Sequence, residues 1–230
     1  MRRVGPWRIW VTRTQPEAGT TAERLRAMGH EPVAAPVLVS RRIPRAAIDP
    51  AGIDLADIEA LAFTSAAGVR AFADLSPARD LAVFAVGAAT AEAARAAGFG
   101  AVRTAGGDVQ ALATAIADAR PGRVLNPTAR KPAADLVALL AARGAEARSV
   151  VVYETVPAPE APPEAIDAVL VHSARAARII AGLIGPDRAP LLTVFAISEA
   201  AAAPLRGLPF ARVVAAPFPD EASLLDLLQA

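Results

Sequence analysis

The sequence predicts an α/β protein of two lobes, each built on a doubly wound parallel sheet. Apolar segments that end in small or hydroxylated residues alternate with Ala-rich helical segments over residues 58–147, and the alternation resumes at residue 167. Strands that alternate with helices of roughly 10 to 15 residues are typical of βαβ units and parallel sheets. Between the two regions lies an extended segment, residues 149–156, which carries the chain's only tyrosine, Tyr153. We interpret this segment as a link between two lobes, with Tyr153 facing the cleft between them.

An internal repeat defines the lobes. LAFTSAAGVRAF (61–72) resembles VLVHSARAARII (169–180), and VFAVGAATAEAA (83–94) resembles VFAISEAAAAPL (194–205). The start of the chain, from RIWVT to ERLRAMGHEPV, resembles residues 123–150 in the same way. Each lobe is therefore expected to hold the same set of βα units. The predicted domains are a discontinuous first α/β lobe, residues 1–38 plus 157–230, an inserted second α/β lobe, residues 41–150, and two extended linkers at about 36–41 and 150–157.

The first elements follow from local signals. Residues 8–12 (RIWVT) are an apolar strand candidate. A helix is expected over residues 16–28, because proline suits a first helical turn and Gly29 suits a C-terminal stop. Residues 31–40 are apolar and contain prolines, which predicts an extended segment. Residues 41–57 are charged and contain two prolines and a glycine, which predicts a loop.

The later elements follow from the repeated change between apolar and Ala-rich segments, with glycines ending several helices. In the inserted lobe we expect strands at 58–63, 81–86, 101–103, 123–125 and 146–155, and helices at 66–74, 88–97, 108–119 and 133–143. After a proline-rich loop at 156–163, we expect strands at 168–171, 191–197 and 212–215, followed by helices that end at residues 183, 205 and 228.

The composition bounds the kind of protein. A hydrophobic content of 54% in 230 residues is ample for buried cores, and no apolar run reaches the roughly 18 residues of a membrane span. The chain has no cysteine and only two histidines, so we expect no metal site. A net charge of +1 with interspersed charges argues against nucleic-acid binding. Because the N-terminus lacks the apolar region of a secretory signal, we expect a soluble, cytoplasmic protein with no membrane partner.

The candidate ligand site lies outside the carboxyl ends of the strands, where doubly wound sheets bind ligands. The residues expected there are nearly all small, and each opens a helix. Free backbone N–H groups and the positive end of the helix dipole can form anion sites at such positions, which suits a ligand with many carboxylates or phosphates. The alternative is that the Ser, Thr and Asn side chains act only as helix N-caps. The candidates are Arg13, Thr14, Thr64, Ser65, Gly87, Ala88, Asn126, Pro127, Thr128, His172, Ser173 and Ser198.

Several classes of enzyme lack their residues in this sequence. No strand is expected to end in an aspartate, as a phosphoacceptor receiver domain requires. The sequence contains no GxxxxGK[ST] loop, no GxGxxG after the first strand and no GxSxG elbow. His172 could act as a base, although a lone histidine beside an N-cap serine is more often structural. An enzyme with these residues would work mainly by holding its substrate and stabilising charge.

These segments resemble the uroporphyrinogen-III synthase family over nearly the whole chain. The matching segments, in order, are VTR at 11–13, FTSAAGV at 63–69, AVGAATAEAARAAG at 85–98, LNP at 125–127 with LLAARGAEA at 139–147, and VVYETVP at 151–157. The resemblance implies two flavodoxin-like lobes joined by a two-stranded extended linker. It also implies an enzyme without metal or organic cofactor that acts on hydroxymethylbilane, a linear tetrapyrrole with many carboxylates. In that reaction water leaves, the terminal ring D is inverted through a spiro intermediate, and the ring closes to uroporphyrinogen III.

The resemblance also assigns roles to particular residues. Tyr153 matches the family tyrosine that assists loss of the hydroxyl, and Thr90 matches a threonine of the cleft, so these two are the expected catalytic residues. Ser65 and Ser173 would bind substrate carboxylates, largely through neighbouring backbone N–H groups. Arg13 is a candidate carboxylate partner, with a surface or linker salt bridge as the alternative. The remaining substrate-binding candidates are Thr64, Gly87, Asn126 and Ser198, and the protein is expected to be a monomer.

One segment departs from the family pattern. The family usually shows a glycine closely followed by a threonine in the C-terminal lobe, as the inserted lobe does at Gly87 and Thr90, whereas here Ser198 and Glu199 stand in that place. Glu199 favours a helix N-terminus but would repel a substrate carboxylate that arrives there. The alternative function is therefore a catalytically impaired relative that binds a tetrapyrrole or another polyanion as a regulator. A binding protein like the periplasmic ones is disfavoured, because no export signal is present.

Overall fold

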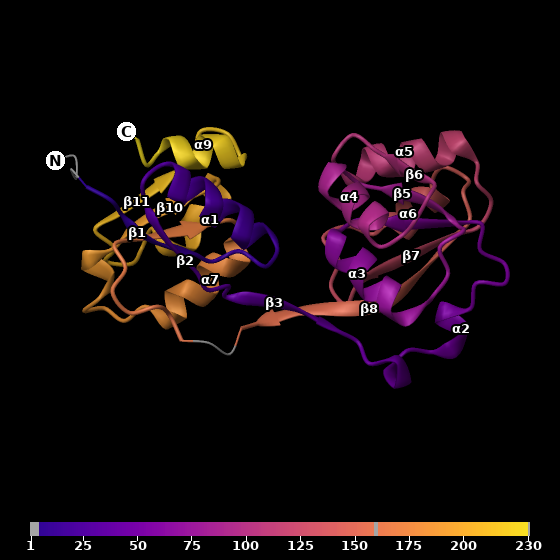
Figure 1. Ribbon diagram of the computed structural model, residues 1–230, viewed down its shortest axis with the longest axis horizontal. Coiled ribbons are helices and arrows are strands. Elements are labelled where there is room, and N and C mark those ends of the chain that lie inside the picture. The colour runs from indigo at the N-terminus through magenta and orange to yellow at the C-terminus, as the bar shows by residue number, and fades with distance from the viewer. Residues whose placement is uncertain (1–4, 159–160, 230) are drawn as a thin grey trace. The chain divides into compact units, whose positions relative to one another are not determined.

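The computed structural model describes residues 5–158 and 161–229 and divides the chain into two compact units. Lobe 1 comprises Met1–Val39 and Val156–Ala230, and lobe 2 comprises Ser40–Thr155. Lobe 1 is thus built from the two ends of the chain, which Figure 1 colours indigo and orange to yellow. No helix among the described residues is long and apolar enough to cross a membrane.

Lobe 1 contains a five-stranded sheet in the order β11-β10-β9-β1-β2. All of its strand pairs are parallel, as expected from the alternation of strands and helices. The strands are β1 (Arg8–Val11), β2 (Glu31–Ala34), β9 (Ala168–Val171), β10 (Thr193–Ala196) and β11 (Arg212–Ala215). The helices are α1 (Glu17–Ala27), α7 (Ala174–Leu183), α8 (Glu199–Ala202) and α9 (Glu221–Asp226), with 3₁₀ turns η2 (Ala189–Leu191) and η3 (Ala203–Leu205).

Helices cover both faces of this sheet, so its central strands are apolar on both sides. Ile9 and Leu170 pack with α1 and α9 on one face, while Trp10 and Val169 pack with α7 and α8 on the other. The consecutive apolar residues of β9 are all buried, as in other parallel sheets covered on both faces. Because both faces are covered, a ligand would bind at the ends of the strands, where the strands meet the loops.

Lobe 2 contains a six-stranded sheet in the order β3-β8-β7-β4-β5-β6. The four pairs β8–β7, β7–β4, β4–β5 and β5–β6 are parallel. The strands are β3 (Leu38–Arg42), β4 (Ala60–Phe63), β5 (Ala82–Ala85), β6 (Val102–Thr104), β7 (Val124–Ala129) and β8 (Ala147–Pro157). The helices are α2 (Pro50–Ile53), α3 (Ala66–Leu75), α4 (Ala88–Ala96), α5 (Val109–Ala119) and α6 (Leu136–Ala141), with a 3₁₀ turn η1 (Arg45–Ala47).

The core of lobe 2 has the same two-sided arrangement. Leu61 and Phe63 pack with Phe72 of α3 on one face, and Ala60 and Ala62 pack with the helices α5 and α6 on the other. The rings of Phe63 and Phe72 meet edge to face, with centroids 5.9 Å apart. Both lobes are therefore doubly wound α/β layers with their own cores, which confirms the predicted fold class.

The sheet orders have the relationship that the sequence repeat requires. β1 and β2 of lobe 1 stand in the places of β7 and β8, and β9, β10 and β11 stand in the places of β4, β5 and β6. The registers agree as well, because Trp10 lies opposite Val169 in lobe 1 where Leu125 lies opposite Leu61 in lobe 2. In each lobe the strand order reverses once, between β1 and β9 and between β7 and β4. Ligands of doubly wound sheets bind at that point.

Some elements differ from the expected ones for local reasons. Strand β7 continues through Asn126, Pro127 and Thr128, because β8 pairs with it along its whole length. The helix expected over 133–143 begins at Leu136, where Asp135 provides the N-cap. The helix expected to end at 205 changes to a 3₁₀ turn at Ala203, because the proline that follows cannot continue an α-helix. The predicted loop 41–57 contains η1 and α2, and part of the predicted loop 156–163, residues 159 and 160, lies outside the described residues.

Candidate active site

A pocket of about 480 Å³ lies at the carboxyl ends of the strands of lobe 2, where the strand order reverses. We call it the switch-point pocket. It combines residues that follow β4, β5, β6 and β7 with the end of β8. Its lining is Thr64, Ser65, Val86, Gly107, Asp108, Val109, Thr128, Ala129, Lys131, Pro132, Ala133, Ala134, Tyr153 and Thr155.

Two hydroxyl groups meet in this pocket. The Tyr153 hydroxyl lies 2.9 Å from Ser65 Oγ. Ser65 is the N-cap of α3, and its Oγ accepts a hydrogen bond of 3.0 Å from the Gly68 N–H. The Tyr153 side chain is only 9% exposed, and its ring packs in the core shared by β4, α3 and β8. The phenol is therefore fixed by packing on one side and by a serine on the other.

The approach of α3 to the sheet depends on Gly68. A Cβ atom at this position would lie 2.9 Å from the carbonyl oxygen of Pro127 and 3.3 Å from Ser65 Oγ. The first contact is with backbone, which cannot move away cheaply. The missing side chain lets the first turn of α3 lie directly against β7, which places Ser65 beside the end of that strand.

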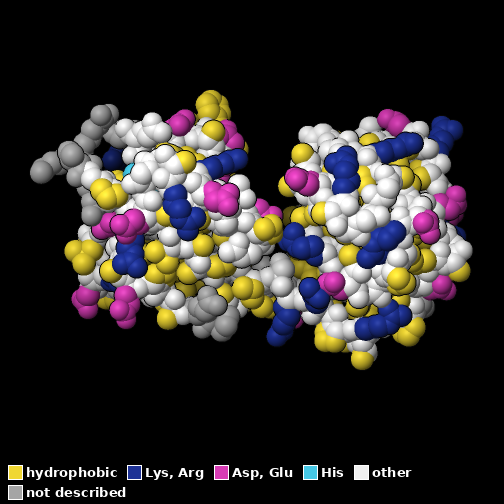
Figure 2. Space-filling model, in the orientation of Figure 1, with side chains coloured by type: hydrophobic (Ala, Val, Ile, Leu, Met, Phe, Trp, Pro, Cys, Tyr) yellow, Lys and Arg dark blue, Asp and Glu magenta, His cyan; other side chains and the backbone are white. Residues whose placement is uncertain are grey.

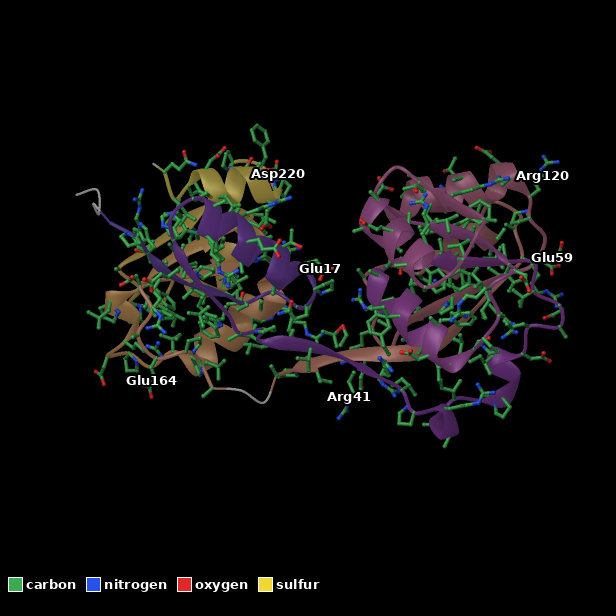
Figure 3. All side chains as sticks on the ribbon, in the orientation of Figure 1. Glu17, Arg41, Glu59, Arg120, Glu164 and Asp220 are labelled. Carbon is green, nitrogen blue, oxygen red and sulfur yellow. The ribbon has the colours of Figure 1, made fainter. Side chains whose placement is uncertain are left out.

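The charged groups near the pocket differ in how they are satisfied. Asp108 is the N-cap of α5 and accepts a 2.8 Å hydrogen bond from the Ala111 N–H. Arg130 donates to Glu154 at 3.1 Å, and Glu154 also accepts from Arg41 at 2.5 Å (Figure 3 labels Arg41). These hydrogen bonds, the one from Arg41 first, lower the pKa of Glu154 below its ordinary value. Lys131 is exposed and has no ion pair within the described part of the chain.

In lobe 1 the corresponding place is occupied by a network of ionic and polar side chains. The Glu221 carboxylate lies 2.7 Å from Arg13 Nη1 and 3.1 Å from His172 Nε2, and it accepts a 2.5 Å hydrogen bond from the Thr21 hydroxyl. The His172 side chain is 9% exposed, and its buried Nδ1 has no hydrogen-bond partner among the described residues. We call these four residues the Glu221 network.

The ionisation of Glu221 follows from this environment. Burial would raise the pKa of its carboxyl group. The hydrogen bonds from His172 and Thr21, with the positive charges of His172 and Arg13, outweigh burial and lower the pKa from 4.5 to about 2. Glu221 is thus held as a carboxylate, and it lies in the first turn of α9, where the helix dipole favours negative charge.

The two lobes differ at equivalent positions. The strand registers place Arg13 where lobe 2 has Thr128 and His172 where it has Thr64. Glu221 directly follows the N-cap Asp220 (labelled in Figure 3), and Val109 directly follows the N-cap Asp108. Thr128, Thr64 and Val109 all line the switch-point pocket. Smaller or apolar residues thus line an open pocket in lobe 2, where lobe 1 has charged groups bound to one another.

The other predicted residues of lobe 2 lie outside the pocket lining. Thr90 is on α4 and is only 5% exposed. Gly87 is the N-cap of α4, and a Cβ atom there would lie 3.5 Å from the Cα atom of Gly107, which lines the pocket. The buried Asn126 side chain donates a 2.7 Å hydrogen bond to the Ala62 carbonyl and so ties β7 to β4.

The predicted serines of lobe 1 are both helix N-caps. Ser173 Oγ accepts from the Ala176 N–H at 3.1 Å, and Ser198 Oγ accepts from the Ala201 N–H at 3.3 Å. Glu199 is bound to Arg206, with distances of 2.5 and 2.6 Å between the two groups. Its negative charge therefore has a partner on the adjacent turn.

Sequence reasoning missed several residues that line the pocket or close its counterpart. Lys131 could have been found, because it is the chain's only lysine and follows the end of a predicted strand. Glu221 gave no signal, because its partner Arg13 is 208 positions away in sequence. Within residues 5–158 and 161–229, no group of three or more His, Cys, Asp or Glu side chains could hold a metal ion.

A larger cavity, of about 700 Å³, lies at the amino ends of the strands of the same sheet. The guanidinium of Arg123 in its wall is bound to Asp57 and, at 3.0 Å, to Glu146. Because ligands of doubly wound sheets bind at the carboxyl ends of the strands, the switch-point pocket is the better candidate for the chemistry.

Comparisons with known proteins agree with this architecture. The family model described as uroporphyrinogen-III synthase HemD matches residues 19–226. The crystal structure of uroporphyrinogen-III synthetase from Helicobacter pylori is 16% identical, covers 97% of this chain and 98% of its own, and superposes with a TM-score of 0.67. A mutant uroporphyrinogen III synthase from the extremely thermophilic bacterium Thermus thermophilus is 18% identical over 96% of each chain, with a TM-score of 0.55. No curated protein matched the sequence.

Proposed function

The chain belongs to the uroporphyrinogen-III synthase family, and from this premise we propose that it cyclises hydroxymethylbilane to uroporphyrinogen III. The family's place in tetrapyrrole biosynthesis fits an α/β scaffold whose strand ends carry many helix N-termini. Helix N-termini bind carboxylates through free N–H groups and the helix dipole, and the substrate carries many carboxylates.

The reaction consumes a proton at the leaving hydroxyl and releases a proton from ring D. Protonation of the terminal hydroxyl lets it leave as water, and the methylene carbon left behind is attacked by the substituted α-carbon of ring D. The spiro intermediate breaks its bond to the neighbouring bridge carbon, which then joins the other α-carbon of ring D. That carbon finally loses a proton, so the net change is the loss of one water molecule.

The contact between Ser65 and Tyr153 is the observation that supports a role for this pocket. Ser65 Oγ already accepts a hydrogen bond from the Gly68 N–H, so its own hydrogen is available for the Tyr153 oxygen. The phenol hydrogen is then free to point toward the leaving hydroxyl. In this proposal Tyr153 donates the proton or hydrogen bond that assists departure of water, and Ser65 orients Tyr153.

The other predicted residues have supporting roles in the proposal. Thr64, Gly87, Asn126 and the backbone N–H groups after Ser65 bind the substrate in lobe 2, and Thr90 assists Tyr153 in the reaction. Ser173, Ser198 and Arg13 belong to lobe 1, where backbone N–H groups at the starts of α7 and α8 are the donors. Arg13 contributes its charge within the Glu221 network.

We also propose that a monomer carries out the reaction in the cytoplasm and that nucleic acid is not a partner. Figure 2 shows Lys and Arg side chains interspersed with Asp and Glu on the visible face, and the net charge is +1, whereas nucleic-acid binding requires clustered basic residues. Size-exclusion chromatography at micromolar concentration tests the oligomeric state.

A coupled assay tests the proposed activity. Hydroxymethylbilane is generated in situ with the purified protein present, and the uroporphyrinogen isomers are separated after oxidation. Predominant isomer III is expected. Formation of isomer I alone, the product of spontaneous closure, would instead support the second candidate, a relative that binds a tetrapyrrole without cyclising it, which Glu199 at the start of α8 favours.

A further inference from the structure

Lys131 provides a positive charge at the switch-point pocket that no ion pair within the described residues uses. It is the only lysine in the sequence, it is exposed, and it lines the pocket together with Tyr153 and Ser65. Resting on the proposed function, we propose that the Lys131 ammonium group binds a carboxylate of the substrate in lobe 2.

The neighbouring arginine shows why Lys131 is available. Arg130 directly precedes it, and its guanidinium is bound to Glu154, which also holds Arg41. The backbone N–H of Arg130 donates to the Tyr153 carbonyl oxygen at 2.9 Å, which fixes the chain beside the tyrosine. Of the two consecutive cations after β7, Arg130 thus joins strands, and Lys131 lines the pocket next to an anchored backbone.

The acidic residue of the pocket does not compete for Lys131. Asp108 is bound to the first turn of α5 by its hydrogen bond from the Ala111 N–H, and it has no ion pair with Lys131. The other polar groups of the lining, Ser65, Thr64 and Thr128, are uncharged hydroxyls. Lys131 is therefore the only side chain in the pocket lining that can offer a full positive charge to an anion.

Lobe 1 has a cation near the corresponding strand end, and that cation already has a partner. Its cation Arg13 occupies the position equivalent to Thr128, and Glu221 neutralises it at 2.7 Å. In lobe 2 the position of Glu221 is occupied by Val109, which cannot bind a cation. The lobe 2 equivalent of Glu221 therefore offers no carboxylate to Lys131.

An ammonium group on a flexible four-carbon stem suits a flexible acetate or propionate side chain, because it needs no fixed planar geometry. Loss of a charge-assisted hydrogen bond of this kind is expected to weaken substrate binding by about tenfold. Since Lys131 binds a substituent and not the reacting carbons, it acts on binding more than on the chemical step.

The first experiment compares the kinetics of four proteins in the coupled assay. Lys131→Gln is expected to raise KM by roughly tenfold and leave kcat within about twofold, because it removes binding common to substrate and transition state. Lys131→Arg is expected to stay near the wild type, since it keeps the charge. Arg95→Gln is the matched control, because Arg95 is an exposed cation in the last turn of α4 and is not part of the pocket lining. Equal KM values for wild type and Lys131→Gln would overturn the proposal.

The second experiment reads the side chain directly and needs no turnover. Reductive methylation with ¹³C-formaldehyde labels the one lysine and the α-amino group, and it preserves both positive charges. The Lys131→Arg variant lacks the lysine signal and so assigns it. Addition of uroporphyrin III, a stable octacarboxylate, is expected to shift the Lys131 signal in a saturable way, and an unchanged signal at saturating porphyrin would refute the assignment.

The two readouts separate this proposal from the proposed function. If the wild type forms only isomer I, the synthase activity is absent, and the NMR titration still decides whether Lys131 binds a polycarboxylate. If isomer III forms, but KM is the same in Lys131→Gln and porphyrin does not shift the Lys131 signal, the synthase activity stands and the proposed role of Lys131 is wrong.

Discussion

The guanidinium of Arg13 lies 2.7 Å from the carboxylate of Glu221, although the two residues are 208 positions apart in the sequence. This contact joins the end of the first strand to the beginning of the last helix. It shows how the two ends of the chain complete one sheet and its cover in lobe 1. Because both tryptophans, Trp7 and Trp10, also belong to this lobe, its unfolding has its own spectroscopic signal.

The Glu221 network predicts a loss of lobe 1 stability in acid. The pKa of Glu221 is about 2 in the folded protein, compared with the ordinary value of 4.5 that applies to the unfolded chain, so the folded state favours the carboxylate. The stabilisation is fully present above pH 4.5 and is lost as pH falls from 4.5 toward 2. Urea denaturation followed by tryptophan fluorescence at several pH values should show this decline.

Glu221→Gln should reduce stability at pH 7 by about 1 to 3 kcal/mol, because it leaves Arg13 without its anion and weakens the hydrogen bonds made by His172 and Thr21. It should also remove the part of the acid-induced decline that belongs to this carboxyl group. Glu23→Gln, on the exposed side of α1, serves as the control and should leave the pH dependence unchanged. Parallel pH profiles for wild type and Glu221→Gln would contradict the assigned cause.

Tyr153→Phe should lower kcat by roughly 10²- to 10⁴-fold, the range expected for loss of a positioned proton donor. The ring stays in its packed site, so the melting temperature should change little. Loss of the hydrogen bond to Ser65 should lower the free energy of unfolding by about 1 kcal/mol. The coupled assay and a thermal melt measure the two effects. A rate equal to that of the wild type would remove Tyr153 from the mechanism.

Gly68→Ala should destabilise lobe 2 by about 1 to 3 kcal/mol, because the added methyl group meets the Pro127 carbonyl oxygen at 2.9 Å. The displacement should also move Ser65 away from Tyr153 and lower activity. Gly182→Ala is a matched control with the opposite sign. It lies within α7 with nothing within 4 Å of the added Cβ, so alanine should stabilise that helix by up to about 1 kcal/mol. Thermal melts of both variants test the contrast.

Arg206→Gln should weaken substrate binding through lobe 1. The hydrogen bond from Arg206, followed by its charge, lowers the pKa of Glu199 and holds its carboxylate against η3. Without Arg206, the charge of Glu199 beside Ser198 should repel a substrate carboxylate and raise KM. The double variant Glu199→Gln/Arg206→Gln should restore the KM of the wild type. An unchanged KM in the single variant would indicate that the start of α8 does not contact the substrate.

Local signals along the chain were enough to predict the class of fold and the family. The alternation of apolar strands with Ala-rich helices predicted two parallel α/β layers, because periodicity and helix-ending glycines are local properties. The repeat also paired the right segments, since β4 with α3 and β9 with α7 occupy equivalent places in the two sheets. The segment VVYETVP and the other matching segments were sufficient to predict the uroporphyrinogen-III synthase family, which the family model confirms.

Which side chains come into contact could be seen only in the folded protein. Regular alternation along β8 would place Val152 and Tyr153 on opposite faces of the sheet. The bulge opposite Thr128 and Ala129 brings both side chains into one core, so that Tyr153 can reach Ser65. The same holds for Lys131, which has no ion pair within the described residues, and for Arg13, which is bound to Glu221. Whether a cation has a partner depends on residues that are distant in the chain, and a local sequence pattern does not show which distant residues come into contact.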